Sequence, residues 1–233
     1  MRYRGLLFAV LLVIAGVGNW YWFSHASQTN NFQIAGEFVH RINASEKVVA
    51  LTFDDGPRGP LSRLLMDELN RLGVKATFFV VGRQIKQFPQ LTRDLWLSGH
   101  QLANHSFHHQ PMNTERPWFF YQEIINTDAL IRKTGYKGII HFRAPMGKKR
   151  FVLPLLLSMQ DKTHVLWDVN PRDYLGTAPE KMVQTVLDKV KPGSIVLLHD
   201  RENTLASLPA MVKGLRAKGY RFVTVDELLK LQR

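Results

Sequence analysis

The chain has 233 residues, of which 45% are hydrophobic and 21% are charged, and this composition excludes an intrinsically disordered protein. It has no cysteine, which excludes disulfides, thiolate metal sites and a cysteine nucleophile, so any metal must be held by histidine, carboxylate or water. The net charge of +12 suits anionic partners such as acidic envelope polymers. No nucleic-acid-binding motif is present, so we expect no DNA or RNA partner. We expect a monomer with one globular domain.

The first segment of the chain is basic and then apolar. Arg2 and Arg4 precede the uncharged run Gly5–Phe23, which has 19 residues, close to the ~20 that cross a bilayer as a helix. Two tryptophans and a tyrosine near its far end suit the membrane interface. We therefore predict a signal anchor over residues 1–26, with the remaining chain on the non-cytoplasmic side of the cell membrane, periplasmic or extracellular.

Cleavage of this segment stays open as an alternative. Ser24 and Ala26 form a small-x-small pattern, and a signal peptidase that cut after Ala26 would release a secreted domain. The polar stretch that follows has no hydrophobic periodicity, so we predict a linker over residues 27–45 that lies outside the fold. The folded domain is then expected over residues 46–233.

From Lys47 onward, short apolar runs rich in Val, Ile and Phe alternate with longer amphipathic stretches, which is typical of an α/β protein. The predicted strands are Lys47–Phe53, Ala76–Val81, His100–Asn104, Ile139–Phe142, His164–Trp167, Ser194–Leu198 and Arg221–Val225. The predicted helices are Leu61–Leu72, Lys86–Ser98, Arg116–Thr134, Pro179–Val190 and Leu205–Lys218. About seven such units indicate a parallel sheet, closed as a barrel or open and doubly wound. No G-x-G-x-x-G motif follows the first strand, which disfavours a dinucleotide-binding fold.

Ionisable residues lie at the carboxyl ends of the predicted strands. In a (β/α) barrel these ends converge on one face, where active sites lie. We therefore expect one site that combines carboxylates, imidazoles and a guanidinium group. The residues concerned are Asp54, Asp55, His105, His109, Arg143, Asp173, His199 and Asp200.

One aspartate and two histidines form a three-ligand set for Zn²⁺ or another divalent transition metal, with positions left for water and substrate. In the run "HSFHH", His105 can pair with His108 at i+3 or with His109 at i+4, and both spacings share a helical face, so spacing cannot choose. The other member of the pair Asp54 and Asp55 would act as general base on a water molecule, and a remote histidine as general acid. The pattern predicts metal-assisted hydrolysis.

Five ordered motifs resemble those of the polysaccharide deacetylases with a NodB-like domain, carbohydrate esterase family 4. They are "LTFDDGP" at Leu51–Pro57, "NHSFHH" from Asn104, "FRAPMG" from Phe142, "NPRDY" from Asn170 and "LLH" ending at His199. The resemblance covers Lys47–Leu231 and implies a distorted (β/α) barrel of about seven parallel strands. It also implies a hydrolase that removes N-acetyl groups, as acetate, from peptidoglycan, a chitin-like polymer or poly-N-acetylglucosamine.

The resemblance implies a role for each matching residue. Asp55, His105 and His109 would hold the metal, with Zn²⁺ expected and Co²⁺ or Ni²⁺ as alternatives. Asp54 would be the base that deprotonates the attacking water. Arg143 would fix this carboxylate by charge-assisted hydrogen bonds.

The remaining motif residues complete the implied reaction. His199 would protonate the leaving amine, and Asp173 would hold its imidazolium and raise its pKa. The backbone N–H of Met146 would stabilise the oxyanion together with the metal. Leu197 and Trp167 would form the wall of the pocket around the acetyl methyl group.

Three residues depart from the family pattern. Asn170 replaces an aspartate in the fourth motif, Tyr174 replaces a tryptophan, and Met146 replaces an aromatic residue. These departures concern contacts to sugar rings more than catalysis, so they leave substrate preference open. The alternatives are a deformylase or deacetylase of a lipid-linked sugar, an O-acetyl esterase, and an inactive membrane-tethered glycan-binding module.

Overall fold

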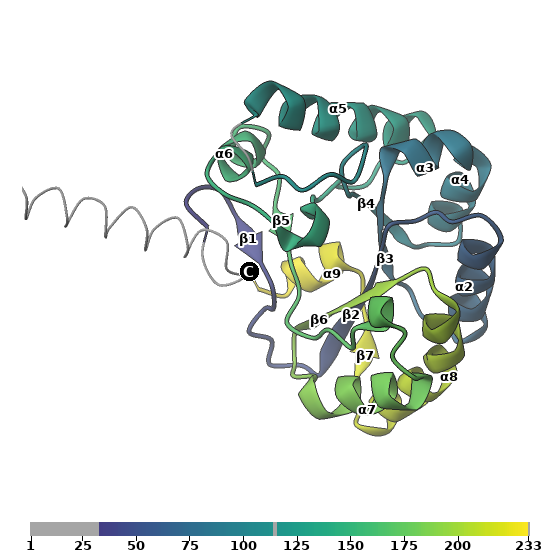
Figure 1. Cartoon of the computed structure of the whole chain (residues 1–233). Helices are drawn as coiled ribbons and strands as arrows, with labels where there is room; N and C mark the ends of the chain where they lie inside the picture. The colour runs from purple at the N-terminus through teal and green to yellow at the C-terminus, as the bar shows by residue number, and fades with distance from the viewer. Residues whose placement is uncertain (1–32, 114–115, 233) are drawn as a thin grey trace, which may run out of the picture.

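The computed structural model describes residues 33–113 and 116–232, which form an α/β fold on parallel strands (Figure 1). The strands are β1 Phe38–Val39, β2 Val48–Asp54, β3 Thr77–Val80, β4 Gln101–Asn104, β5 His164–Val165, β6 Ser194–His199 and β7 Arg221–Phe222. The α-helices are α2 Pro60–Arg71, α3 Gly82–Gln87, α4 Pro89–Leu97, α5 Pro117–Lys133, α6 Val152–Ser158, α7 Pro179–Lys189, α8 Glu202–Ala217 and α9 Val225–Lys230. Two short 3-10 helices are η1 Pro145–Gly147, between α5 and α6, and η2 Asp173–Leu175, between β5 and α7.

Every strand pairing among the named strands is parallel. One sheet has the order β4-β3-β2-β6, with β7 beside the start of β2, and a second sheet joins β1 to β5. Single bridges link the two sheets, because Phe142 pairs with Asn104 on one side and with His164 on the other, while Val169 pairs with Val196. The α/β class with a parallel sheet is confirmed. The predicted strand Ile139–Phe142 is reduced to the bridges at Phe142.

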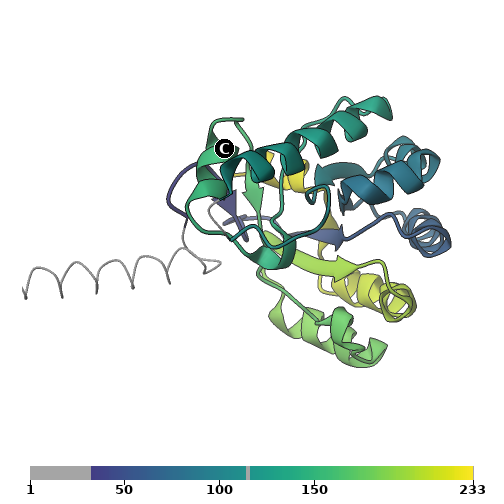
Figure 2. The same ribbon diagram turned by 45° about the horizontal axis from the view of Figure 1, so that its top comes forward.

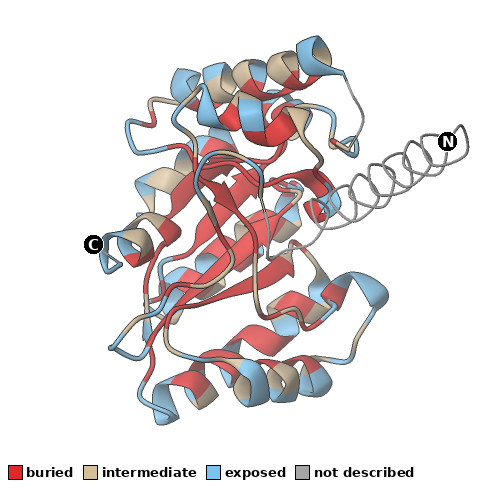
Figure 3. Ribbon diagram, turned by 90° about the vertical axis from the view of Figure 1, so that its left-hand side faces the viewer, coloured by how far each residue is buried: buried red, intermediate tan, exposed pale blue. Residues whose placement is uncertain are grey.

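The central strand β2 is buried along its whole length, as expected for a parallel strand covered on both faces. Helices surround the strands on the outside (Figures 1 and 2), and the buried residues concentrate on the strands and the inner helix faces (Figure 3). The largest apolar cluster packs α2, α7 and α8 against β2, β3 and β6. This arrangement directs the carboxyl ends of β2, β3, β4 and β6 to one edge of the sheet.

The predicted helix Lys86–Ser98 is wrong as a single element. The structure breaks it into α3 and α4 at Phe88, and Pro89 occupies the first position of α4. Proline lacks the N–H that would continue the hydrogen bonds of the preceding helix, but it fits the first turn of a new one. Two further helices, α6 and α9, were not predicted. They are only 7 and 6 residues long, too short for a clear apolar period.

The predicted linker over residues 27–45 is wrong for its last part. β1 pairs with β5 in parallel, and Ile42 has only 1% of its surface exposed. A strand of two residues carries no alternating pattern, so the sequence gives no sign of it. The predicted membrane segment lies outside the described residues. Within those residues, no helix has both the length and the apolarity needed to cross a membrane.

Candidate active site

A buried carboxylate and guanidinium pair lies at the end of β2. Asp54 is the last residue of that strand, and its Oδ1 accepts a hydrogen bond of 2.6 Å from Arg143 Nη1. Its Oδ2 lies 3.6 Å from His105 Nε2. Asp54 has 3% of its surface exposed and Arg143 has none. One carboxylate oxygen is therefore held by the arginine, and the other faces the candidate metal ligands.

Arg143 is buried without an unsatisfied nitrogen. Nε donates to the backbone oxygen of Val165 at 3.0 Å, Nη2 to that of Leu166 at 3.0 Å, and Nη1 also to Thr52 Oγ1 at 2.8 Å. Its guanidinium also stacks over the ring of Phe79, 3.9 Å from the centroid. Burial of a charge is tolerated only when it is paired and its donors are satisfied. The orientation of Asp54 is thus set by contacts from several strands.

Asp55, His105 and His109 offer three ligand atoms that lie within 4.8 Å of one another. Asp55 Oδ1 lies 3.0 Å from His109 Nε2 and 3.6 Å from His105 Nε2. This oxygen is buried and has no hydrogen bond of good geometry within the described residues. An unsatisfied carboxylate oxygen between two imidazole nitrogens is the donor set that a divalent transition metal prefers.

The protonation of His105 also fits metal binding. Its Nδ1 lies 2.9 Å from the backbone oxygen of Arg143, a contact that requires a proton on Nδ1 and leaves the lone pair of Nε2 free. Burial lowers the pKa of His105, so the ring is neutral at neutral pH. The three residues therefore fit a catalytic metal site.

The two candidate histidines of the "HSFHH" run face different ways. His108 Nδ1 lies 2.6 Å from Glu123 Oε1, and its side chain is half exposed outside the cavity. The run is not helical, and both Ser106 and His109 have positive φ angles, 66° and 60°. The expectation of a shared helical face is therefore wrong, and it is the left-handed turn at His109 that brings this ring to Asp55 and His105.

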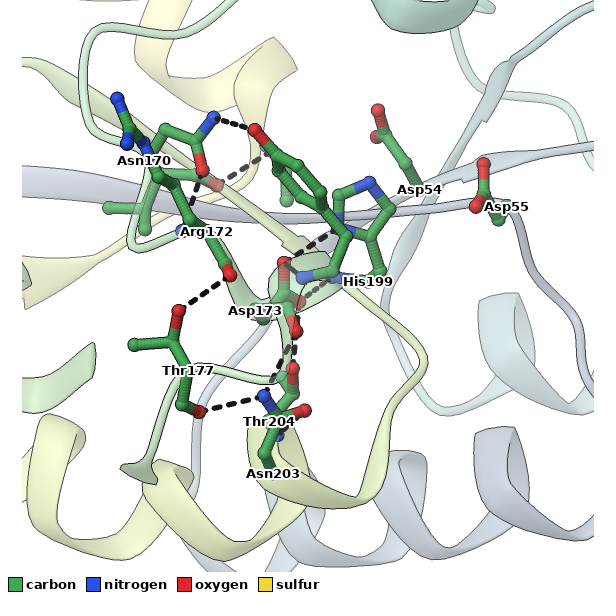
Figure 4. Close-up of polar contacts among 12 residues, drawn as sticks. Asp54, Asp55, Asn170, Arg172, Asp173, Thr177, His199, Asn203 and Thr204 are labelled. Atoms are coloured by element: carbon green, nitrogen blue, oxygen red, sulfur yellow. Dashed lines mark hydrogen bonds and ion pairs between the residues drawn. The ribbon is translucent and has the colours of Figure 1, made fainter. Parts of the chain in front are cut away.

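On the opposite side of the cavity, His199 ends β6 and is held by Asp173 (Figure 4). His199 Nδ1 lies 2.8 Å from Asp173 Oδ1, and its backbone N–H donates to Asp173 Oδ2 at 2.6 Å. Thr204 Oγ1 donates to the same Oδ2 at 2.8 Å, while Asn203 Nδ2 donates to the backbone oxygens of Asp173 and Thr177. Asp173 is fully buried and is held by the first turn of α8.

The pKa of His199 is raised above its ordinary value. Burial alone lowers it, but the hydrogen bond to Asp173 and the negative charges of Asp54, Asp173 and Asp55 outweigh burial. A histidine with a raised pKa keeps its proton to higher pH. This is the state that a general acid needs.

Between the two sides lies a cavity of about 220 Å³. It is lined by Asp54, Asp55, His105, His109, Met146, Trp167, Asn170, Tyr174, Leu197 and His199. Arg143 and Asp173 lie behind Asp54 and His199 and do not line it. All the residues singled out from the sequence for metal or substrate contact thus meet at one cavity.

The three departures from the family pattern lie together at this cavity or its rim. Met146 has a φ of 57° and a side chain with more than half of its surface exposed. Tyr174 meets the ring of His199 edge-on at 5.5 Å between centroids. Asn170 accepts a hydrogen bond from the backbone N–H of Arg172 at 2.8 Å and lies 3.5 Å from the Tyr174 hydroxyl (Figure 4). Asn170 therefore shapes the loop that carries Tyr174.

Asp200 was expected in the site and does not line the cavity. It is buried, its Oδ2 accepts a hydrogen bond from Ser62, and burial raises its pKa to about 6. Asp200 follows the last residue of β6, and its side chain turns toward the start of α2, where Ser62 lies. Asp200 packs closely against Gly56, because a Cβ placed on that glycine would lie 2.6 Å from its carboxylate.

Two polar contacts of the site were not predicted from the sequence. Arg58 Nη2 donates to Asp55 Oδ2 at 2.8 Å, which leaves Oδ1 for the two histidines. Thr204 holds Asp173, as described above. The i+3 spacing of Asp55 and Arg58 is a weak signal for the first contact. Nothing local signals the second, since Thr204 and Asp173 are 31 residues apart.

Comparison with known proteins places this geometry among glycan deacetylases. The family model described as "Polysaccharide deacetylase" matches residues 41–155. A peptidoglycan-N-acetylglucosamine deacetylase of Bacillus cereus is 32% identical over 201 residues, 84% of this chain and 94% of the relative. A chitooligosaccharide deacetylase of Azorhizobium caulinodans is 30% identical over 196 residues, 77% of this chain and 93% of the relative. The crystal structure of the Bc1960 peptidoglycan N-acetylglucosamine deacetylase superposes with a TM-score of 0.80 at 27% identity, covering 83% of this chain and 92% of that chain.

Proposed function

The chain belongs to the polysaccharide deacetylase family, and from this premise we propose that it hydrolyses N-acetyl groups of an N-acetylated cell-envelope or extracellular polysaccharide and releases acetate. The observation that carries the proposal is the single cavity in which Asp54 and His199 face the set of Asp55, His105 and His109. The names of the relatives support peptidoglycan and chitin-type oligomers as substrates. We also propose that the overall fold is a distorted (β/α) barrel, which the bridges between the two sheets support.

Asp54 is the proposed general base. Its Oδ1 is occupied by Arg143, so Oδ2 is the oxygen that accepts the proton of the attacking water. The buried guanidinium keeps the carboxylate in one rotamer through a short charge-assisted hydrogen bond. A base that is already oriented needs no reorganisation during the reaction.

Asp55, His105 and His109 are the proposed ligands of a divalent transition metal, with Zn²⁺ first and Co²⁺ or Ni²⁺ as alternatives. When bound, such an ion lowers the pKa of water and polarises the acetamide carbonyl. Arg58 fixes Asp55 through its second oxygen. The hydrogen bond from His105 Nδ1 to the Arg143 backbone oxygen keeps Nε2 directed at the site.

His199 is the proposed general acid. An amine anion is a poor leaving group, so the nitrogen must be protonated as the C–N bond breaks. Asp173 holds the ring through Nδ1, which leaves Nε2 to give its proton to the leaving nitrogen. The raised pKa keeps that proton on the ring to higher pH than in an unperturbed histidine.

The remaining lining residues bind the acetamide and the sugar. The backbone N–H of Met146, presented by the positive φ in η1, is the proposed oxyanion donor. Leu197 and Trp167 form the apolar wall for the acetyl methyl group. Tyr174 offers its ring to the sugar. We also propose that residues 1–26 hold the enzyme in the cell membrane with the domain on the non-cytoplasmic side, as a monomer.

The proposed function is tested by acetate release from the full chain on N-acetylated glycans, with chelator and with Zn²⁺, Co²⁺ or Ni²⁺ restored. We expect release that stops with chelator and returns with metal. Release that is indifferent to chelator would contradict a metal-dependent reaction. An O-acetyl ester is tested beside the amide to distinguish an esterase from an amidase. If the enzyme is an esterase, His199→Ala should keep its activity on the ester.

Two histidines of the same "HSFHH" run, His108 and His109, provide a matched pair of variants that tests the assignment of the metal ligands. His109→Ala should weaken Zn²⁺ binding by at least about 100-fold in a competition titration, because it removes a ligand. His108→Ala should change it less than about threefold, because His108 pairs with Glu123 instead. Equal losses, or a larger loss for His108, would overturn the assignment.

A further inference from the structure

We propose that a second surface, here called the basic groove, binds the anionic groups of a glycan strand, so that this enzyme favours carboxylate-bearing glycans over neutral ones. The inference rests on the proposed function, because it names a substrate class for that reaction. The basic groove lies between α3 and α4 on one side and the last turns of α5 on the other, and it encloses about 510 Å³. It is lined by Ile85, Lys86, Pro89, Gln90, Arg93, Leu130, Lys133 and Thr134.

The lining of the basic groove is positive. Lys86, Arg93 and Lys133 are all exposed, and no carboxylate is among the lining residues. Within the described residues, none of the three cations has an ion-pair partner. Three cations around one cavity repel each other, and a bound anion relieves that repulsion.

The acids of the same helices are engaged elsewhere. Asp94 of α4 pairs with Arg63 of α2 and accepts a hydrogen bond from Gln90. Glu123 of α5 accepts from His108 and from two backbone N–H groups of the loop before α5. Asp128 of α5 pairs with Lys162 at 2.6 Å. The three carboxylates of α3, α4 and α5 are thus bound to other partners, and the groove keeps its charge.

The floor of the basic groove suits a sugar. Leu130 is half-buried above the buried Ile85, and it gives the floor an apolar surface that can contact the C–H face of a pyranose ring. The Gln90 amide donates to Asp94 and the Thr134 hydroxyl to the Ile131 backbone oxygen, which leaves the oxygens of both side chains to accept hydrogen bonds from ring hydroxyls. Lysine and arginine on the rim pair with carboxylates. Apolar floor, amide, hydroxyl and cations together match an acidic glycan better than a neutral one.

The basic groove adjoins the loop over residues 105–109, which carries two of the candidate metal ligands. Lys86 Nζ lies 5.0 Å from the centroid of the Phe107 ring, and Phe107 stands in the chain between His105 and His109. The catalytic cavity, at about 220 Å³, is smaller than the ~300–1,000 Å³ of typical small-molecule sites. Only a small part of a strand fits there, so the rest must lie on the surface.

The test compares two substrates and two triple variants of the full chain. The substrates are soluble peptidoglycan fragments, which carry carboxylates, and a neutral N-acetylglucosamine oligomer. The variant Lys86→Gln/Arg93→Gln/Lys133→Gln should raise KM for the acidic fragments about tenfold at low salt, because rim charges act on encounter and binding, with kcat retained. Its kcat/KM for the neutral oligomer should stay within about twofold of wild type.

The matched control removes three exposed lysines from α7 and α8, at the opposite end of the fold in Figure 1, as Lys181→Gln/Lys189→Gln/Lys213→Gln. Equal effects of the two triple variants on the acidic fragments would show a net-charge effect and overturn the proposal. No effect of the groove variant, or an equal loss of activity on both substrates, would overturn it as well.

If the wild-type enzyme releases no acetate, binding is measured instead by co-sedimentation with insoluble peptidoglycan. Weaker binding of the groove variant alone then supports the groove, although the proposed function has failed. Thermal melting of both variants checks that they fold.

Discussion

The two sides of the catalytic cavity hold their proton-transfer groups by different means. On the base side, Asp54 is fixed by Arg143, a fully buried side chain whose bonds reach two other strand segments. On the acid side, His199 is fixed by Asp173, which sits in a short 3-10 turn and depends on the first turn of α8. The base side is therefore held by contacts from strand segments, whereas the acid side joins the end of β6 to a buried 3-10 turn and the start of α8. We expect mutations on the base side to affect folding as well as catalysis, and those on the acid side mainly to affect the pH dependence.

The largest effect is expected for Asp54→Asn. The amide cannot accept the proton of water, so kcat should fall by about 10³- to 10⁴-fold, while Zn²⁺ remains bound because Asp54 is a base and not a ligand. Steady-state kinetics and a metal titration on the same preparation check this. Loss of the metal together with activity would mean that the roles of Asp54 and Asp55 are exchanged.

Arg143→Gln should destabilise the folded protein, which is not expected of variants on the acid side. Asp54 would keep its burial and lose its charged partner, which should lower the free energy of unfolding by about 3–5 kcal/mol. Urea denaturation measures this. The double variant Asp54→Asn/Arg143→Gln should regain part of the loss, because no unpaired charge remains. A change below about 1 kcal/mol in the single variant would show that the pair is not a core element.

On the acid side, Asp173→Asn should shift the pH profile of kcat. Asp173 raises the pKa of His199, and burial lowers it once that partner is gone, so the pKa falls in the variant. The general acid works only when protonated, and the rate falls as pH rises through this pKa. The alkaline limb should therefore move to lower pH. Asp188→Asn, an exposed acid on α7, is the control, and an unmoved limb in Asp173→Asn would contradict the role of His199.

Thr204→Val should have the smallest effect. It removes one of the hydrogen bonds to Asp173 Oδ2 and leaves both contacts of Asp173 with His199. The loss of one hydrogen bond, about 1 kcal/mol, should lower kcat about fivefold and shift the alkaline limb slightly in the same direction as Asp173→Asn. A loss as large as that of Asp173→Asn would mean that Thr204 alone orients the turn.

Much of the fold could be predicted because its long elements repeat their pattern many times. β2, β6, α2, α5 and α7 all appear within a few residues of the predicted bounds. β1 has two residues, and its place is set by β5, which lies 126 residues further along the chain. No local pattern can carry that information. The break at Pro89, by contrast, was readable from the chain, since proline ends the hydrogen bonding of a helix.

The residues of the candidate site also differ in how far the sequence can predict their positions. The strand-end rule gathers Asp54, His105 and His199 at one edge, because parallel strands share a direction. The choice between His108 and His109 needs the backbone, since the run is not a helix and a positive φ decides which ring turns inward. The supporting contacts of Arg58 and Thr204 need the tertiary structure, because polar residues of these types have many other possible partners.

The polarity of β1 has a practical consequence. It runs parallel to β5, which leads to Trp167 at the cavity, so the chain before β1 arrives at the far pole of the sheet, where Glu37 lies beside α9. At residue 33 the chain lies beside β5, where Gln33 Oε1 is 2.7 Å from His164 Nδ1. Because Gln33 does not line the cavity, we expect a bead, an electrode or a fusion partner joined upstream of it to leave the cavity open to a long, insoluble substrate.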